Sequence, residues 1–423
     1  MNLIVILSAI PVIIWAFMAP IASRFADLNS ITTSLGQILG LVGMALFSIN
    51  LILAGRFKLL DKYFKGLDKV YAKHARIGAI AFSMLLFHPL FLVVKYLVIS
   101  TQEAALFFVP FTNMPITWGI IGLLIMIILI SFTFYIKLRY NKWKMSHYFM
   151  KLAFFFAVIH TFLISSDISR NDLLRYYMLV LVFIAALVSI RKVVYDKLSI
   201  KKFKYKIVGV RILNQDIVEV EMEALKNKMT FNSGQFAFWS FFSLGVSDES
   251  HPFSISSSTK ENNLKITVKN LGDFTSTFKS LKLNDIVIVD GPYGNFSYSN
   301  VNNKNQIWIA GGIGITPFYS MAMSLESEYK VDLYYSVKEN TEAVYMKEFI
   351  DLSQKNSNFR FKLWSAKDRG YINGESVANL SSGLADKDIF LCGPSMFMES
   401  LKDQFVKQGV DVKKIHYENF SFN

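Results

Sequence analysis

The chain has 423 residues, of which 52% are hydrophobic and 18% are charged, and its formal net charge at pH 7 is +13. This hydrophobic fraction excludes intrinsic disorder, and a single cysteine, Cys392, excludes a disulfide-stapled scaffold. Basic residues in so apolar a chain more often flank membrane spans than bind nucleic acid, so we expect no nucleic-acid partner.

The first 200 residues contain six long apolar runs, each close to the ~20 residues that an α-helix needs to cross a bilayer. The runs cover residues 2–22, 31–55, 76–100, 116–137, 148–166 and 173–190. Pro11 and Pro20 leave the bounds of the first run open. Because no basic segment precedes that run, we expect a first span rather than a cleaved signal peptide. The pattern predicts a six-helix transmembrane domain.

Lysine and arginine are concentrated in every second linker between these runs. The basic linkers are residues 56–76, 137–144 and 191–206, whereas the alternate linkers contain only Arg24 and Arg170. Because cytoplasmic linkers carry the excess of basic residues, we expect both termini and the whole second half in the cytoplasm. This orientation accounts for most of the positive charge without a polyanionic partner.

Four of the six histidines lie in or beside the third and fifth apolar runs. His74 and His88 are 14 residues apart, and His147 and His160 are 13 residues apart. At ~1.5 Å per residue, each separation is about 20 Å along a helix, which predicts two opposed histidine pairs at two depths. Two axial imidazoles saturate a haem iron and favour electron transfer over ligand binding.

An isolated polar or pore-lining role is the alternative for each histidine taken alone. Ionisable residues within spans are rare and usually functional, and two matched pairs favour metal ligation. One feature opposes a straight fifth helix, because 13 residues at roughly 100° per residue leave a large angular offset between His147 and His160. We therefore expect this helix to be bent, rewound or rotated.

From about residue 204 short strands replace the long apolar runs. Segments 217–223, 264–269 and 286–289 alternate or are rich in β-branched residues, which predicts a small antiparallel barrel to about residue 297. The region contains Gly234-Gln235-Phe236, His251-Pro252-Phe253-Ser254-Ile255-Ser256 and Gly272-Asp273-Phe274-Thr275-Ser276-Thr277. Hydroxyls and backbone N–H groups at a helix start suit a diphosphate, although a capped turn explains each motif more simply.

A βαβ pattern begins after residue 305. The predicted strand 307–310 is followed by Gly311-Gly312-Ile313-Gly314-Ile315-Thr316-Pro317-Phe318. Strand 331–337 is followed by Lys338, and strand 388–391 by Cys392-Gly393-Pro394-Ser395. Glycines let the backbone approach a phosphate, Thr316 can cap the helix or bond the phosphate, and Pro317 suits a first helical turn. Open α/β sheets bind ligands where strands end and helices begin. For Cys392 the alternative is a small buried thiol.

Joined to Asp290-Gly291-Pro292-Tyr293-Gly294 and to Glu418-Asn419-Phe420, these motifs resemble a ferredoxin–NADP reductase-type flavin and nicotinamide module. With six spans and paired histidines, nearly the whole chain resembles the NADPH oxidase and ferric reductase superfamily, and most closely its bacterial oxidase homologues. The resemblance implies a multi-pass protein of a bacterial cell membrane. Its expected domains are a six-helix transmembrane bundle (1–200), an antiparallel β-barrel for FAD (201–297) and an α/β nucleotide-binding domain (298–423).

The resemblance also implies FAD, two b-type haems and NADPH or NADH as cofactors. His74 with His147 is expected to ligate the inner haem, and His88 with His160 the outer haem. The implied FAD residues are His251, Pro252, Phe253, Ser254, Thr275, Ser276 and Thr277. The implied nicotinamide dinucleotide residues are Gly312, Gly314, Thr316, Pro317, Gly393 and Pro394. The implied catalytic residues are Cys392, beside the nicotinamide, and Phe420, stacked on the flavin, with Phe422 as a competing candidate.

Lys338 and Ser336 follow the second strand, where a 2′-phosphate is expected, and Arg369 is a further candidate. Ordinary surface residues are the alternative, so Lys338 favours NADPH over NADH only slightly. Lys95 and Arg170 lie toward the outer side and are candidates for haem propionates or an anion, although snorkelling and loop solvation also explain them.

The implied activity passes electrons from NAD(P)H through FAD and the two haems to an outer acceptor. With O2 as acceptor, the protein is a superoxide-generating NAD(P)H oxidase in a lipid bilayer. A ferric or cupric metalloreductase and an electron-transfer flavocytochrome serving an external protein are alternatives, and a non-redox histidine channel is a distant one. The outer segments hold no acidic or histidine cluster, which favours oxygen, and no segment resembles an activator site, so we expect no obligatory protein activator.

Overall fold

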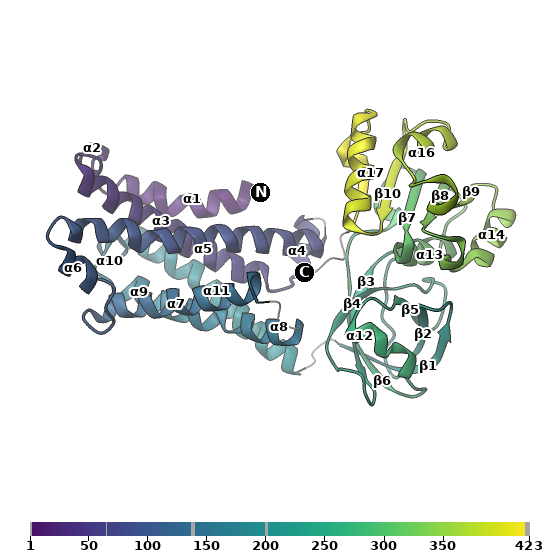
Figure 1. Cartoon of the computed structure of the whole chain (residues 1–423), viewed down its shortest axis with the longest axis horizontal. Helices are drawn as coiled ribbons and strands as arrows, with labels where there is room; N and C mark the ends of the chain where they lie inside the picture. Colours follow the sequence, from purple (N-terminus) through teal and green to yellow (C-terminus); the bar gives the residue numbers. More distant parts are fainter. Residues whose placement is uncertain (1, 65, 137–139, 199–201, 419–423) are drawn as a thin grey trace. The chain divides into compact units, whose positions relative to one another are not determined.

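The structure is a computed structural model that describes residues 2–64, 66–136, 140–198 and 202–418 (Figure 1). Contacts between Cα atoms divide the chain into two compact units. The helical unit contains Met1–Phe57 and Val70–Ser199, and the strand-rich unit contains Lys58–Lys69 and Ile200–Asn423. Each unit is described by itself.

The helical unit is built from long helices joined by short ones. The long helices are α1 (Asn2–Ala16), α3 (Leu28–Leu53), α5 (Leu67–Leu97), α7 (Met114–Phe134), α9 (Met150–Leu163) and α11 (Asp172–Leu198). The short helices are α2 (Ile21–Arg24), α6 (Thr101–Leu106), α8 (Tyr140–Tyr148) and α10 (Asp167–Arg170). A further short helix, α4 (Lys58–Phe64), belongs to the strand-rich unit.

Five helical segments among the described residues are long and apolar enough to cross a membrane. They are Leu28–Leu53, Lys69–Leu97, Met114–Phe134, Lys142–Leu163 and Asp172–Arg191. The first predicted span, residues 2–22, does not reach this length, because α1 has only 15 residues. Its hydrogen bonds tighten at Phe17 and Met18, and Pro20 follows, which cannot donate to a helix and disfavours helical geometry at the residue before it.

The fifth apolar run is interrupted between its two histidines. Helix α8 ends at Tyr148 and α9 begins at Met150. The Phe149 N–H donates to the Ser146 carbonyl at 3.0 Å, and the Leu152 N–H donates to the Phe149 carbonyl at 2.8 Å, so the chain winds more tightly here than an α-helix. The 13-residue separation of His147 and His160 predicted a helix that is bent, rewound or rotated, and the structure shows local rewinding.

Residues 203–293 form a six-stranded antiparallel sheet that closes on itself. Its strands are β1 (Phe203–Ile212), β2 (Ile217–Ala224), β3 (Phe236–Phe242), β4 (His251–Ser254), β5 (Leu264–Lys269) and β6 (Ile286–Tyr293), in the order β4-β3-β6-β1-β2-β5. Ile255 bridges to Ile266, and the Ser256 N–H donates to the Lys265 carbonyl at 2.8 Å, which joins the two edges. Buried residues such as Ile207, Val220 and Trp239 fill its core. This sheet is the antiparallel barrel that the sequence predicted.

The remainder of the strand-rich unit is a parallel sheet with helices on both faces. The strands are β7 (Asn305–Gly311), β8 (Lys330–Val337), β9 (Phe359–Ser365), β10 (Asp388–Cys392) and β11 (Ile415–Tyr417), in the order β11-β10-β7-β8-β9. The helices are α12 (Asp273–Ser276), which belongs to the barrel, and α13 (Ile315–Met323), α14 (Met346–Lys355), α15 (Ala366–Arg369), α16 (Gly374–Leu380) and α17 (Ser395–Lys407). The strand order reverses beside β7, because β8 and β9 are added on one side of it and β10 and β11 on the other, and open parallel sheets bind ligands at such a point.

Candidate functional site

The helical unit brings the four membrane histidines together in the two pairs predicted from the sequence. The ring centres of His74 and His147 are 6.0 Å apart, and those of His88 and His160 are 6.3 Å apart. A metal–imidazole bond is ~2.1 Å and the ring centre lies about 1 Å further, so two imidazoles on opposite sides of one metal ion have centres about 6 Å apart. Both pairs therefore fit one axially ligated metal ion each.

Backbone carbonyls orient three of these imidazoles. The Nδ1 atom of His74 lies 3.0 Å from the Asn50 carbonyl oxygen, that of His88 lies 2.7 Å from Gly36 O, and that of His160 lies 2.8 Å from Pro115 O. Because a carbonyl only accepts hydrogen bonds, Nδ1 is the donor in each ring, and in a neutral imidazole this leaves the lone pair on Nε2. Metal-bound histidines are commonly held in this way.

Two glycines make room for the 88/160 pair. A Cβ atom at Gly40 would lie 2.7 Å from Nδ1 of His88, and one at Gly119 would lie 2.9 Å from Nδ1 of His160. Each glycine follows its carbonyl-bearing residue by four positions, Gly36 on α3 and Pro115 on α7, so it lies one turn along the same helix face. Sequence reasoning missed both glycines, although small residues at helical spacing indicate close helix packing.

A cavity of about 890 Å³ adjoins the 88/160 pair, within the ~300–1,000 Å³ that small-molecule and cofactor sites occupy. Its wall is mainly apolar and includes both histidines, Gly40 and Gly119. Lys95 and Arg170 also line it, so the two predicted cations lie at the same cavity as the histidines. In the described part of the chain, no three His, Cys, Asp or Glu side chains gather for a metal ion.

In the barrel, the two predicted FAD motifs lie against each other. The His251 ring, on β4, stacks on Phe274 of α12 with ring centres 3.8 Å apart and an angle of 21° between planes. The hydroxyls of Thr275, Ser276 and Thr277 each donate to the carbonyl three residues earlier. The structure therefore shows the capped turn, and a diphosphate here would use backbone N–H groups or displace these bonds.

The carboxyl ends of β7 and β10 bring the glycine motifs of the α/β domain together. Ala310 pairs with Cys392 in register, and a Cβ atom at Gly314 would collide with the Cys392 backbone. Gly393 also lies against Gly311, because a Cβ atom there would be 3.1 Å from Gly311 Cα. Gly312 has φ +55° with open space at its Cβ position, so the loop can receive a ligand there.

Two of the predicted residues in this loop point inward. Thr316 is buried in α13 and its hydroxyl donates to the Ile313 carbonyl at 3.2 Å. Pro317 occupies the same first turn and is also buried. The sequence allowed Thr316 either to cap the helix or to bond a phosphate; in this conformation its hydroxyl bonds back to a carbonyl, and α13 has no side-chain cap. Pro394 lies at the N-cap position of α17, beside Gly393.

Cys392 and Glu418 are both buried at this site. The Cys392 side chain is 1% exposed, and burial, together with the charge of Glu418, raises the pKa of its thiol. Glu418 is 4% exposed and its Oε1 accepts a hydrogen bond from the Asn295 N–H at 3.1 Å. Sequence reasoning assigned Glu418 no role of its own. Phe420 and Phe422 lie outside the described residues.

The residues predicted to distinguish the two dinucleotides lie at the carboxyl ends of β8 and β9. Lys338 is exposed, and its carbonyl accepts from the Lys367 N–H at 3.0 Å. Ser336 is buried, and the exposed Arg369 guanidinium lies 5.6 Å from the Trp364 ring centre. Strand pairing therefore brings both candidate cations, Lys338 and Arg369, to the same edge of the sheet.

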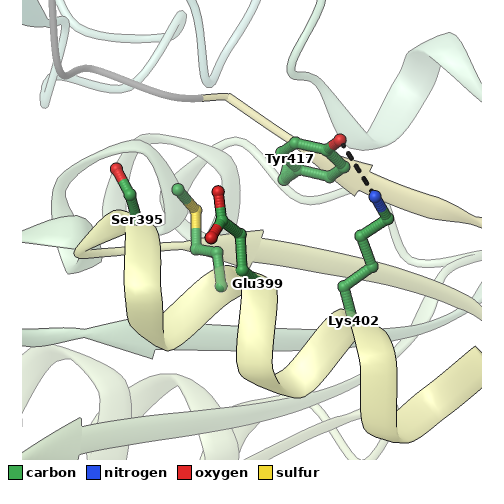
Figure 2. A pocket seen from close by; sticks show the side chains of 5 residues that line it. Ser395, Glu399, Lys402 and Tyr417 are labelled. Atoms are coloured by element: carbon green, nitrogen blue, oxygen red, sulfur yellow. Dashed lines mark hydrogen bonds between the residues drawn. The ribbon is translucent and has the colours of Figure 1, made fainter.

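A small pocket lies between α17 and β11 (Figure 2). Ser395, Glu399 and Lys402 line this pocket from α17, and the Lys402 ammonium lies 3.5 Å from the Tyr417 hydroxyl. Its volume of about 20 Å³ is room for about one water molecule. This pocket is therefore too small for a dinucleotide.

Three family models match consecutive parts of the chain. The ferric reductase like transmembrane component matches residues 39–163, the FAD-binding domain matches residues 202–297, and the oxidoreductase NAD-binding domain matches residues 308–403. The transmembrane match contains all four paired histidines, and the other two contain the motifs at β4, β7 and β10. The strand-rich unit therefore carries the FAD-binding and NAD-binding domains of an oxidoreductase.

Similar proteins match part of the chain. A flavohemoprotein of Candida norvegensis is 29% identical over 238 residues, which are 53% of this chain and 60% of that protein. A flavohemoprotein of Candida albicans is 32% identical over 181 residues, 39% of this chain and 45% of that protein. The chain thus spans about half the length of these relatives. Among solved structures, the flavohem-like FAD/NAD binding domain of nitric oxide dioxygenase from Vibrio cholerae has 20% identity and a TM-score of 0.45, covering 51% of this chain and 97% of that one.

We expect Cys392 to resist alkylation in the folded protein at pH 8. Its raised pKa leaves less thiolate at that pH than an exposed cysteine has, and thiolate is the reacting species. Mass spectrometry after iodoacetamide treatment measures this, with denatured protein as the control. Labelling of folded protein as fast as of denatured protein would contradict the placement.

Proposed function

Since this chain has the architecture of the NADPH oxidase and ferric reductase transmembrane superfamily, with a ferredoxin–NADP reductase-type C-terminal module, we propose that it is a transmembrane NAD(P)H oxidase. In this proposal it takes electrons from NAD(P)H in the cytoplasm, carries them through FAD and two b-type haems, and reduces O2 to superoxide on the other side of the membrane. The observation that carries the proposal is the pairing of four histidines at ring-centre distances of 6.0 and 6.3 Å.

The histidine pairs are proposed to hold one haem each, His74 with His147 and His88 with His160. Flavin accepts a hydride and releases electrons singly, and a bis-histidine haem iron carries one electron without a free ligand position. The protein orients the histidine rings. Carbonyls on α3 and α7 hold the imidazole N–H groups, and Gly40 and Gly119 leave space for the rings.

In the strand-rich unit, we propose that the β4 motif at His251–Ser254 holds the flavin and that the loop at Gly312–Gly314 holds the dinucleotide. Cys392 is proposed to stand beside the nicotinamide as a neutral thiol, because burial keeps it protonated. Phe420 is proposed to stack on the flavin and to yield to the nicotinamide. The basic linkers support the orientation with both termini in the cytoplasm.

A ferric or cupric reductase is the second candidate, and the transmembrane family match favours it by its description. The proposed electron-transfer route is the same in both candidates, and only the acceptor on the outer side differs. Lys95, Arg170 and Asp167 line the cavity at the 88/160 pair, and this excess of one positive charge suits an anionic group or superoxide better than a free metal cation. This charge supports oxygen as the acceptor.

We expect purified protein given NADPH to reduce cytochrome c, and superoxide dismutase to abolish most of that reduction. The physical reason is that an iron held by two histidines would have no free site for oxygen and would supply electrons one at a time. The rate of ferric chelate reduction under argon is the matched control. If dismutase has no effect and ferric chelates are reduced much faster, the reductase alternative replaces the oxidase.

The haem assignment predicts that Gly119→Ala and His160→Ala each remove about half of the bis-histidine haem absorbance. The added methyl of alanine overlaps the His160 ring, and the second variant removes the ligand itself. NADPH should still reduce the flavin in both variants, whereas dismutase-sensitive turnover should stop. Gly209→Ala, where a Cβ makes only ordinary contact, is the control. Retention of both haems in His160→Ala would refute the ligand.

For the electron donor, we expect a preference for NADPH that depends on Lys338. A charged hydrogen bond to a 2′-phosphate contributes ~1.5–3 kcal/mol, so Lys338→Ala should lower kcat/KM for NADPH by about 10-fold or more and leave NADH nearly unchanged. Steady-state kinetics with both donors measures this, with Lys407→Ala on α17 as the control. An equal loss with both donors would contradict a 2′-phosphate contact.

A further inference from the structure

A buried chain of polar side chains joins the barrel to the α/β domain. The Tyr345 hydroxyl, from the α/β domain, donates to Glu219 Oε2 on β2 at 2.6 Å and also hydrogen-bonds to Thr267 on β5. Thr267 in turn contacts the Ser256 hydroxyl at 3.1 Å. The exposed fraction is 5% for Tyr345 and 4% for Glu219, so these bonds are made away from water.

The two ends of this chain adjoin the two ligand motifs. Ser256 lies two residues after Ser254 of the flavin motif at β4. At the other end, the Tyr345 ring stacks on Tyr319, with ring centres 3.8 Å apart and 10° between planes, and Tyr319 lies two residues after Pro317. A displacement of Tyr345 would therefore change contacts next to both motifs.

Charge and backbone geometry show that the position of Tyr345 is tightly determined. Its φ is +63°, in the left-handed region that bulky residues avoid, and such conformations persist where the surroundings over-determine them. Arg211 donates to the second oxygen of Glu219 at 2.7 Å, which compensates the buried carboxylate. Burial and the charge of Glu219 raise the pKa of Tyr345, so the phenol remains a donor at neutral pH.

We propose that Tyr345, held by Glu219, is a positioning residue that fixes the dinucleotide loop against the flavin strand and so sets the distance of hydride transfer. In that step the C4–H bond of NAD(P)H breaks with its electron pair, an N–H bond forms on the flavin, and NAD(P)+ leaves. The inference rests on the proposed function, because only a flavin reduced by NAD(P)H makes this distance matter. A misplacement of ~1 Å can lower such a rate about 100-fold.

A second contact allows the variants to keep their fold. The Ser320 hydroxyl donates to the Ser257 carbonyl at 2.7 Å, and the hydroxyls of Ser258 and Ser324 are 3.0 Å apart. These bonds join the same two domains without Tyr345. Loss of the Tyr345 hydroxyl should therefore loosen the alignment of the two domains rather than separate them.

The test is stopped-flow reduction of the flavin by NADPH under argon, in the whole FAD-loaded protein. We expect Tyr345→Phe to lower the limiting rate by about 10-fold or more, with less than about threefold change in the dissociation constant of NADPH. The matched control is Tyr334→Phe, which removes a buried hydroxyl bonded to Ser381 at 2.7 Å within the α/β domain alone. Its limiting rate should stay within about twofold of the unmodified protein. Equal rates in the two variants would overturn the inference.

Two variants of Glu219 keep the inference falsifiable if Tyr345→Phe does not fold. Glu219→Gln retains an acceptor for Tyr345 and should keep the rate within about threefold, whereas Glu219→Leu should lower it about as far as Tyr345→Phe does. Similar rates in Gln and Leu variants would overturn the inference.

Amide hydrogen exchange separates failure of the inference from failure of the proposed function. Exchange over residues 254–258 and 315–323 should rise in Tyr345→Phe and not in Tyr334→Phe, whether or not NAD(P)H is the donor. No rise would overturn the positioning role. Absence of flavin reduction in the unmodified protein with both NADPH and NADH would instead overturn the proposed function.

Discussion

The hydrogen bond from an imidazole Nδ1 to a backbone carbonyl is the interaction on which the helical unit depends. An imidazole in an apolar bundle must satisfy its N–H group, and a helix carbonyl already bonded within its own helix has a second lone pair for this. The carbonyls of Asn50, Gly36 and Pro115 serve His74, His88 and His160 in this way. With Nδ1 bound to a carbonyl, the ring centres of the two histidines in each pair lie about 6 Å apart.

The helix geometry around the histidines follows from that requirement. The helix is interrupted at Phe149, between α8 and α9, and His147 and His160 both meet partners on one continuous helix, α5. Gly40 and Gly119 allow α3 and α7 to approach the rings closely enough for the carbonyl contacts. A larger residue at either position would displace the ring from its carbonyl. Helix packing and imidazole orientation are therefore one constraint.

The strand-rich unit brings together ligand motifs from two domains, the barrel and the α/β domain. Parallel pairing of β7 with β10 places Cys392 beside the loop at Gly311–Gly314, and the barrel places His251 on Phe274. Alignment between the two domains depends on buried polar groups, chiefly Tyr345 with Glu219. Directional hydrogen bonds define a relative position more narrowly than apolar packing does, because they fail when either group moves.

The sequence by itself determined the elements whose signal is local. Apolar length identified the spans, period-two alternation identified β2 and β5, and glycines after strands identified the loops at β7 and β10. Histidine spacing indicated both pairs, and its 13-residue offset indicated that the fifth helix is not regular. The N-terminal run was misjudged, because apolar composition up to residue 22 does not reveal that α1 ends at Ala16, ahead of Pro20.

Only the tertiary structure decided which groups serve which role. Carbonyl partners and the glycines opposite His88 and His160 come from helices far away in sequence, and no local pattern encodes such a contact. Thr275 and Thr316 could have capped a helix or bonded a phosphate, and only the folded geometry shows their hydroxyls on carbonyls. The Tyr345–Glu219 bond joins residues 126 positions apart, and it exists because two independently patterned domains dock with complementary buried polar groups.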